Sequence, residues 1–141
     1  MKKRDLYIIR AVSGAGKTSF AESLVDSLDS KYSSVVCCAD DFMINDIGEY
    51  EFDVKKLSLV HNKCREKFLE AIENEVNLII IANTNTELSH FKFYYDKGIE
   101  NGYRVTVLVL ENYHGNKDIH NVPPETLQRQ RICITKSLKL A

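Results

Sequence analysis

The sequence predicts an α/β fold in which a short parallel β-sheet is flanked by helices, giving three layers. Apolar runs rich in Val and Ile alternate with segments of helical spacing, and this alternation is typical of parallel sheets with helical crossovers. The runs show little polar alternation, as is usual for strands that helices cover. The chain has 141 residues, a length that suits one core, so we expect a single domain over residues 1–141.

Each predicted element has a sequence reason. Apolar runs predict strands at residues 5–12, 34–39, 77–82 and 104–110. Apolar residues three and four positions apart predict helices at residues 17–28, 88–101 and 124–138, and a further helix after Asp53. Asp53 suits an N-cap, Gly102 is a typical stop signal and Pro124 suits a first helical turn. The helix after Asp53 has an apolar stripe that includes His61, so we expect that histidine to be packed rather than catalytic.

A phosphate-loop pattern, A-x-x-x-x-G-K-T, lies at residues 11–18 between the first predicted strand and the first predicted helix. In such a loop, small residues let backbone N–H groups surround an anion, and the positive end of the helix points at the same place. Lys17 is expected to reach the β- and γ-phosphates, and Thr18 to ligate Mg²⁺. Ala11 stands where the strict motif has Gly, and Ala is tolerated there if its φ stays negative.

The expected nucleotide-binding residues are Ser13, Gly14, Ala15, Gly16, Lys17, Thr18 and Ser19. A chance glycine-rich turn before a helix is the alternative. The pattern indicates a three-layer P-loop NTPase fold of the kinase type, because the strand before the loop and the helix after it are both as the motif requires.

Other polar residues follow predicted strands and should meet the loop, because ligands bind beyond the carboxyl ends of parallel strands. Asp40 and Asp41 follow the second strand directly, and either could accept the proton of an attacking hydroxyl. Asp40 is the better candidate because it lies nearer the strand end. A capping role or a solvated acidic turn is the alternative. We expect both aspartates and Asn83 on the substrate side of the site.

Asn83 follows the third strand, where a Walker-B aspartate would stand. Its presence disfavours a hydrolysing motor or a GTPase switch, which need a carboxylate to hold the metal ion. Asn83 is expected to bond the phosphate loop or the acceptor, or else only to end the strand. Positive charge for the transferring group is available from Lys117, Arg129 and Arg131 in a lid, although any one of them taken alone suits a solvated surface position.

Composition excludes some function classes. The net charge of −1 argues against a protein that coats nucleic acid with a broad basic face, but it allows a narrow pocket for one nucleic-acid end. The four cysteines lack the paired spacing of a metal site, so we expect buried thiols. No signal-peptide core and no apolar run of membrane-spanning length is present, so we expect a cytoplasmic protein without a membrane partner.

Together these motifs resemble those of a known group. The segments that carry the resemblance are residues 7–18, Ala39-Asp40-Asp41-Phe42, Tyr50-Glu51-Phe52-Asp53 with Leu57, His61 and Cys64, Asn83-Thr84-Asn85, Gly102-Tyr103-Arg104-Val105 and His120-Asn121-Val122-Pro123. In this order they resemble the NEDD4-binding-protein-2-like P-loop kinases and their bacteriophage relatives. They are similar, more distantly, to the kinase domain of phage polynucleotide kinase. The resemblance covers nearly the whole chain.

The resemblance implies ATP as donor, Mg²⁺ as cofactor and the 5′-hydroxyl end of a polynucleotide as acceptor. It assigns the general base to Asp40, and nucleotide contacts to Lys17 and Thr18. Two positions depart from the pattern. Met43 stands where polynucleotide kinases carry an Arg that contacts the substrate phosphate, and Lys117 stands for the usual lid Arg. Lysine lacks the planar fork of arginine, so we expect weaker activity or a lid role for Arg129.

Three hypotheses follow from these residues. The first is an ATP-dependent kinase that acts on a polynucleotide 5′-hydroxyl. The second is a small-molecule or nucleotide kinase, which would share the loop and the base but need no channel for a strand. The third is a nucleotide-binding module with little catalytic activity, as Met43 and Lys117 suggest. A plain ATPase is disfavoured because no residue stands out to position a water molecule.

Overall fold

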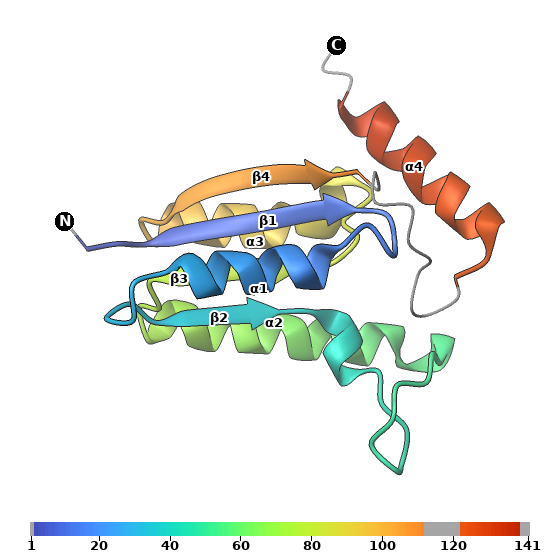
Figure 1. The fold of residues 1–141 in the computed structure, drawn as a ribbon, viewed down its shortest axis with the longest axis horizontal. Coiled ribbons are helices and arrows are strands. Elements are labelled where there is room, and N and C mark those ends of the chain that lie inside the picture. The colour runs from blue at the N-terminus through green and yellow to red at the C-terminus, as the bar shows by residue number, and fades with distance from the viewer. Residues whose placement is uncertain (1, 112–121, 139–141) are drawn as a thin grey trace.

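The computed structural model describes residues 2–111 and 122–138, and it confirms the alternation of strands and helices (Figure 1). The strands are β1 (Asp5–Ala11), β2 (Ser34–Cys37), β3 (Leu78–Ala82) and β4 (Arg104–Leu110). They form one sheet in the order β2-β3-β1-β4, and every pairing is parallel. The phosphate loop leaves β1, which has a strand on each side, so the loop starts from the interior of the sheet.

The helices are α1 (Lys17–Ser27), α2 (Leu57–Glu73), α3 (Leu88–Glu100) and α4 (Pro124–Leu138), with two short 3-10 helices, η1 (Ala39–Phe42) and η2 (Val54–Lys56). Helices α2 and α3 cover one face of the sheet and α1 covers the other, which confirms the three layers. Successive residues of a strand point to opposite faces, so Ile8 packs with α2 and α3 while Ile9 packs with α1. Helix α4 lies at the carboxyl end of β1, where Ile134 joins the α1-side core.

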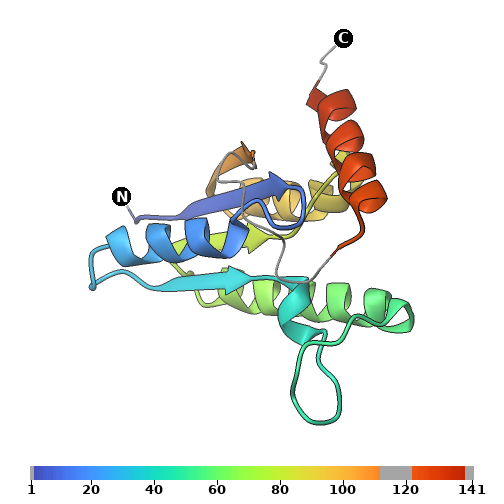
Figure 2. The same cartoon turned by 45° about the vertical axis from the view of Figure 1, so that its right-hand side comes forward.

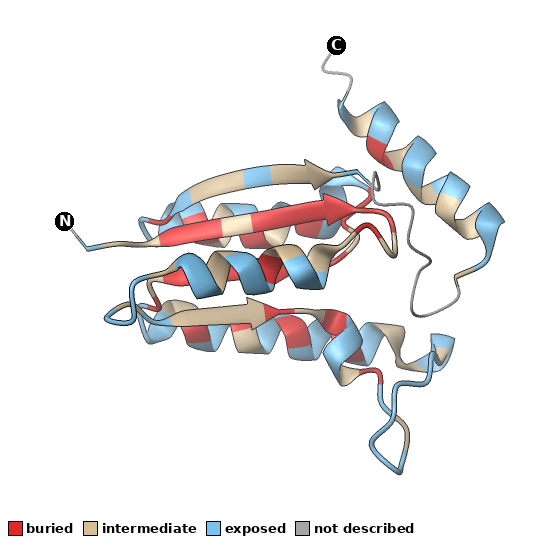
Figure 3. Cartoon of the chain, viewed as in Figure 1, coloured by how far each residue is buried: buried red, intermediate tan, exposed pale blue. Residues whose placement is uncertain are grey.

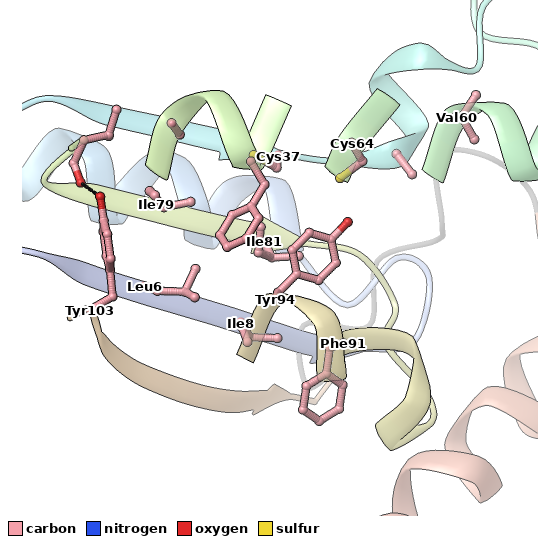
Figure 4. Close-up of a cluster of buried hydrophobic side chains, with 14 of the residues drawn as sticks. Leu6, Ile8, Cys37, Val60, Cys64, Ile79, Ile81, Phe91, Tyr94 and Tyr103 are labelled. Carbon is pink, nitrogen blue, oxygen red and sulfur yellow. Dashed lines mark hydrogen bonds between the residues drawn. The ribbon is translucent and has the colours of Figure 1, made fainter. Parts of the chain in front are cut away.

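The larger core lies between the sheet and the pair α2 and α3 (Figure 4). Phe68 of α2 and Tyr94 of α3 meet edge to face, with their ring centroids 5.0 Å apart. Helix α3 approaches β1 closely at Gly98, where a Cβ atom would lie 2.5 Å from Leu6 Cδ2. A larger residue would require the Leu6 and Val105 side chains to shift, so glycine allows this close approach of helix to sheet.

Burial is unequal across the sheet (Figure 3). The interior strands β1 and β3 are almost completely buried, whereas β2 and β4 are mostly half-buried. The expectation that the second strand is covered on both faces is therefore only partly met, because β2 lies at the edge of the sheet. Strand β2 also ends at Cys37, earlier than expected, because the chain turns there into η1.

Most predicted boundaries are confirmed within two residues. Strand β4 and helix α4 have the expected limits, and Gly102 takes the left-handed conformation of a helix stop, with φ of 77°. Asp53 is a cap as expected, since its side chain accepts a hydrogen bond of 2.9 Å from the Lys55 N–H, although the helix that it caps is η2, which leads into α2. Within the described ranges, no helix combines the length and apolar character needed to cross a bilayer.

Candidate phosphoryl-transfer site

The phosphate loop has the backbone that its sequence predicts. Gly14 and Gly16 both adopt left-handed conformations, with φ of 80° and 96°, and Gly16 is the N-cap of α1. The N–H groups of the first turn of α1 therefore open onto the loop, where Thr18 and Ser19 are exposed. Ala11 is not among the described residues with positive φ, so Ala at the first position of the motif carries no backbone strain.

The turn after β3 is bonded directly to the strand that carries the loop. The Ala11 N–H donates to the Thr84 carbonyl at 3.0 Å, and the Asn85 side-chain amide donates to the Ile9 carbonyl at 2.8 Å. Asn85 itself has φ of 49°, a left-handed conformation that asparagine tolerates. These bonds hold the carboxyl ends of β1 and β3 in one rigid arrangement beneath the site.

Arg10 strengthens the same junction. Its side chain is only 2% exposed and donates from Nε to the Asn85 carbonyl at 2.8 Å and from Nη2 to the Thr86 carbonyl at 3.0 Å. Nη2 also donates to the hydroxyl of Ser137 on α4, and the guanidinium lies 4.9 Å from the centre of the Phe91 ring. Burial lowers the pKa of Arg10. The guanidinium therefore joins β1, the turn after β3 and α4 through neutral acceptors.

Asn83 holds the aspartate turn, which is η1 with Asp40 and Asp41, in place. Its Oδ1 accepts a hydrogen bond of 2.8 Å from the Ala39 N–H, and its Nδ2 lies 3.6 Å from the Cys64 sulfur of α2. The side chain is therefore bonded to the start of η1 and to α2, whereas the sequence analysis expected a bond to the phosphate loop or the acceptor. Asp40 is the next residue after the anchored N–H, so Asn83 sets the position from which that carboxylate leaves the sheet.

The two adjacent aspartates have different surroundings. Asp40 lines the cleft described below, whereas Asp41 interacts with Lys67, whose ammonium group is bonded to the Val36 carbonyl at 2.8 Å. Partial desolvation, with a smaller effect of the Asp40 charge, raises the pKa of Asp41 against the opposing charge of Lys67. Of the two aspartates, Asp40 is thus the one that lines the cleft.

The field around Cys38 shows that Lys17 and Asp40 act on the same region. Burial raises the pKa of the Cys38 thiol to about 11, and the charges of Asp41 and Asp40 add to this effect. The Lys17 ammonium group opposes it. The charges of the phosphate-loop lysine and of the candidate base therefore both reach Cys38, the residue that follows β2.

A cleft of about 650 Å³ connects these groups. The phosphate loop contributes Ser13, the turn after β2 contributes Asp40, and the turn after β3 contributes Asn83. Other walls come from the segment between η1 and η2, from the start of α2 and from α4. The strand ends that the sequence analysis expected to converge are thus brought together in one cavity.

Helix α4 is bonded to the phosphate loop. The Ser13 N–H donates to Gln130 Oε1 at 2.9 Å, and Gln130 Nε2 lies 3.4 Å from the Ser13 hydroxyl. Arg129 lines the cleft beside Gln130, as a lid cation would, whereas Arg131 is exposed. Lys117, the other proposed lid cation, lies outside the described residues.

The sequence analysis missed some residues of the cleft. His61 lines it and is exposed, so the expectation of a packed histidine is wrong, because Val60 and Cys64 provide the buried stripe of α2 instead. Desolvation and the neighbouring charge of Arg65 lower the pKa of His61 and favour its neutral form. Gln130 had no sequence signal, since its partner Ser13 lies 117 positions away.

The described residues suit a magnesium ion that is bound mainly by the nucleotide. They contain no group of three or more His, Cys, Asp or Glu side chains able to hold a metal ion. All four cysteines are free thiols, but only Cys37 and Cys64 are buried, so the expectation of buried thiols is met in part. Magnesium in phosphoryl-transfer sites is commonly held by phosphates, water and one or two protein oxygens. The exposed Thr18 hydroxyl in the first turn of α1 is available to serve as such an oxygen.

Comparison with known proteins finds similar chains of the kind that the sequence resembles. Residues of this chain are 30% identical, over 132 positions and 88% of its length, to human NEDD4-binding protein 2, of which they span only 7%. A structure of the Pnkp1/Rnl/Hen1 RNA repair complex contains a chain with a TM-score of 0.73 and 17% identity, matched over 97% of this chain and 46% of that one. No family model matches.

A second kind of kinase has a similar fold. The APS kinase of Mycobacterium tuberculosis matches with a TM-score of 0.53 and 13% identity, over 96% of this chain and 97% of that one. These structural matches are distant in sequence, so they concern the fold alone. They agree with the parallel sheet, the flanking helices and the phosphate loop that follows β1. The chain therefore has the fold of P-loop kinases and is similar in sequence to a short stretch of NEDD4-binding protein 2.

Proposed function

We propose that this chain transfers the γ-phosphoryl group of ATP to a hydroxyl acceptor, and that the acceptor is the 5′-hydroxyl end of a polynucleotide. One observation carries the proposal: Ser13 of the phosphate loop and the carboxylate of Asp40 line the same cleft. A donor phosphate on the loop and an acceptor hydroxyl beside the carboxylate can therefore meet inside it.

The residues divide the reaction between them. The loop N–H groups and Lys17 hold the β- and γ-phosphates, and Asp40 accepts the proton of the attacking hydroxyl. The acceptor oxygen forms a bond to the γ-phosphorus while the bond from that phosphorus to the β–γ bridging oxygen breaks, and ADP leaves. Arg129 lies in the cleft where it can stabilise charge on the transferring group. Thr18 is suited to ligate Mg²⁺ bound with ATP, and such an ion neutralises phosphate charge.

The polynucleotide acceptor is supported by the sequence resemblance and by the fold of the RNA repair complex chain. The pattern of residues at the strand ends is the one that the resemblance assigns to a 5′-hydroxyl kinase, with Asp40 directly after the anchored Ala39 N–H. The cleft is also bordered by exposed aromatic side chains, which suit a nucleotide better than a small polar acceptor.

A small-molecule acceptor is the second candidate, and Met43 favours it. The Met43 side chain is 1% exposed and packs in the core beneath the cleft. An arginine that grips a substrate phosphate cannot be replaced functionally by this buried thioether. The APS kinase match is consistent with this alternative at the level of fold.

A panel of acceptors tests the proposal. The purified chain is incubated with labelled ATP and magnesium, together with single-stranded DNA or RNA that carries a 5′-hydroxyl, a 5′-phosphorylated strand, nucleosides or sugar acids. We expect label only on the 5′-hydroxyl strands, and none with Lys17→Ala. Label on a small molecule alone would favour the second candidate. ATP binding that depends on Lys17, with no acceptor labelled, would contradict both and indicate a binding module.

A further inference from the structure

The segment between η1 and η2 is an ordered loop that projects from the body of the protein (Figures 1 and 2). It folds back on itself through an antiparallel bridge between Ile44 and Tyr50. At the tip, Asn45 Oδ1 accepts hydrogen bonds from the N–H groups of Ile47 at 3.1 Å and Glu49 at 3.0 Å. Gly48 takes a left-handed conformation there, with φ of 83°. The returning strand is therefore held in a defined register beside the cleft.

Two aromatic rings on the returning strand form a wall of the cleft. Phe52 is 61% exposed and Tyr50 is 38% exposed, and both line the cavity that contains Asp40. Beneath them lie Met43 and Val60, which are buried. Large apolar side chains are normally found in a core, so an exposed ring within a functional cleft points to a ligand with an apolar face.

The position of this wall assigns it to the acceptor. The donor nucleotide is held by the phosphate loop, whose contribution to the cleft is Ser13. The aromatic wall belongs to the segment that directly follows the aspartate turn, and Glu51 N–H donates to the Met43 carbonyl at 3.1 Å, close to η1. An acceptor whose hydroxyl reaches Asp40 therefore places its neighbouring atoms against this segment.

The charge on the segment selects the part of the acceptor that binds there. Glu49 and Glu51, which flank Tyr50 in the sequence, are exposed and would repel a phosphate group. A nucleobase is neutral and flat, and stacking on an aromatic ring is favourable for every base. The base, rather than the sugar-phosphate backbone, is the part of a strand that suits this wall.

We propose that Phe52 and Tyr50 form a stacking platform for the terminal nucleobase of the acceptor strand. The inference rests on the proposed function, whose acceptor is a polynucleotide end. A single strand places its terminal base on the platform while its 5′-hydroxyl points to Asp40.

Equilibrium binding tests the platform without requiring activity. The probes are two single-stranded oligonucleotides with a 5′-hydroxyl and a 3′ dye, identical except that one lacks the terminal base. Fluorescence anisotropy is measured with a non-hydrolysable ATP analogue present, for the wild type, Phe52→Ala, Phe52→Trp and Ile47→Ala. Ile47 is a matched control because it is an exposed apolar residue of the same segment that does not line the cleft. Thermal melts check that each variant is folded.

The platform predicts a specific pattern. The wild type should bind the intact strand about 5- to 100-fold more tightly than the abasic strand, the range expected for one stacked base. Phe52→Ala should bring this ratio close to one, whereas Phe52→Trp and Ile47→Ala should keep it. Equal binding of the two probes by the wild type would overturn the inference. An equal loss for both probes in Phe52→Ala would also overturn it, because the ring would then support strand binding in a way that does not involve the terminal base.

Phosphoryl transfer to the same probes separates this inference from the proposed function. Transfer without any dependence on the terminal base would contradict the platform and leave the kinase proposal standing. Base-dependent binding without transfer would contradict the kinase proposal and leave the platform as a binding site. If the wild type bound neither probe, that result would contradict the platform.

Discussion

The side chain of Asn83 accepts a hydrogen bond from the Ala39 N–H at 2.8 Å, and this bond joins the end of β3 to the turn that presents Asp40. Both partners are buried. The position after β3, where a Walker-B aspartate would stand, therefore has a structural role in this sheet. The asparagine holds the neighbouring turn in place, and that turn carries Asp40, the proposed base.

Removing this bond should lower both the free energy of unfolding and the rate of phosphoryl transfer. Asn83→Ala leaves the buried Ala39 N–H without its acceptor, so we expect the free energy of unfolding to fall by about 1–3 kcal/mol. The transfer rate should fall as well, while ATP affinity changes little, because Asp40 loses its fixed position. Urea unfolding and single-turnover transfer measure the two effects. Asn74→Ala, at an exposed position after α2, is the control, and an equal effect there would contradict the account.

The bond between Gln130 and the phosphate loop should compete with the nucleotide. The Ser13 N–H donates to Gln130 Oε1, so a phosphate oxygen that needs this N–H must displace the side chain. We expect Gln130→Ala to bind an ATP analogue about fivefold more tightly, the value of one hydrogen bond of about 1 kcal/mol. Calorimetric titration measures it, with the exposed Gln128→Ala as control. Weaker binding in Gln130→Ala would show instead that the contact supports the loop.

Arg10 should be important for stability although it is charged and buried. It donates to two backbone carbonyls and to Ser137, so Arg10→Ala removes the partners of several acceptors at once. We expect a loss of about 2–4 kcal/mol in the free energy of unfolding. Arg10→Lys should recover only part of it, because lysine lacks the planar fork. Chemical denaturation measures the change, and a loss as small as that of the exposed Arg131→Ala would contradict this role.

The raised pKa of Asp41 makes stability depend on pH in a defined direction. Since its folded pKa lies above its ordinary value of 3.8, the folded protein binds this proton more tightly than the unfolded chain. Its contribution to stability is present below pH 3.8 and is lost as the pH rises through the folded pKa. Asp41→Asn should therefore be more stable than the wild type at pH 7, with a smaller difference at pH 3. Urea unfolding at both pH values checks this, and the opposite order would contradict it.

Local patterns in the sequence predict much of this fold. The apolar runs identify β1 and β3 because both are buried strands without polar alternation. Gly102 and Pro124 mark the limits of neighbouring elements because their backbone preferences do not depend on tertiary contacts. The spacing of the phosphate-loop motif likewise predicts the left-handed conformations of Gly14 and Gly16.

Features that depend on distant contacts could not be predicted in the same way. The left-handed conformation of Asn85 is supported by a bond to Ile9, 76 positions away. The apolar spacing of α2 fits a stripe through either Val60 or His61, and packing against the sheet decides for Val60. Arg10 is a charged residue within an apolar run, and the sequence does not indicate that its partners are backbone carbonyls in the turn after β3.

The most direct test of the central claim is single-turnover transfer from ATP to a 5′-hydroxyl strand by Asp40→Asn. The matched control is Asp46→Asn, because Asp46 is exposed at the tip of the neighbouring segment and does not line the cleft. We expect Asp40→Asn to be slower by about 10²- to 10⁴-fold, with unchanged ATP affinity, and Asp46→Asn to match the wild type. A wild-type rate in Asp40→Asn would contradict the assignment of Asp40 as the base in this cleft.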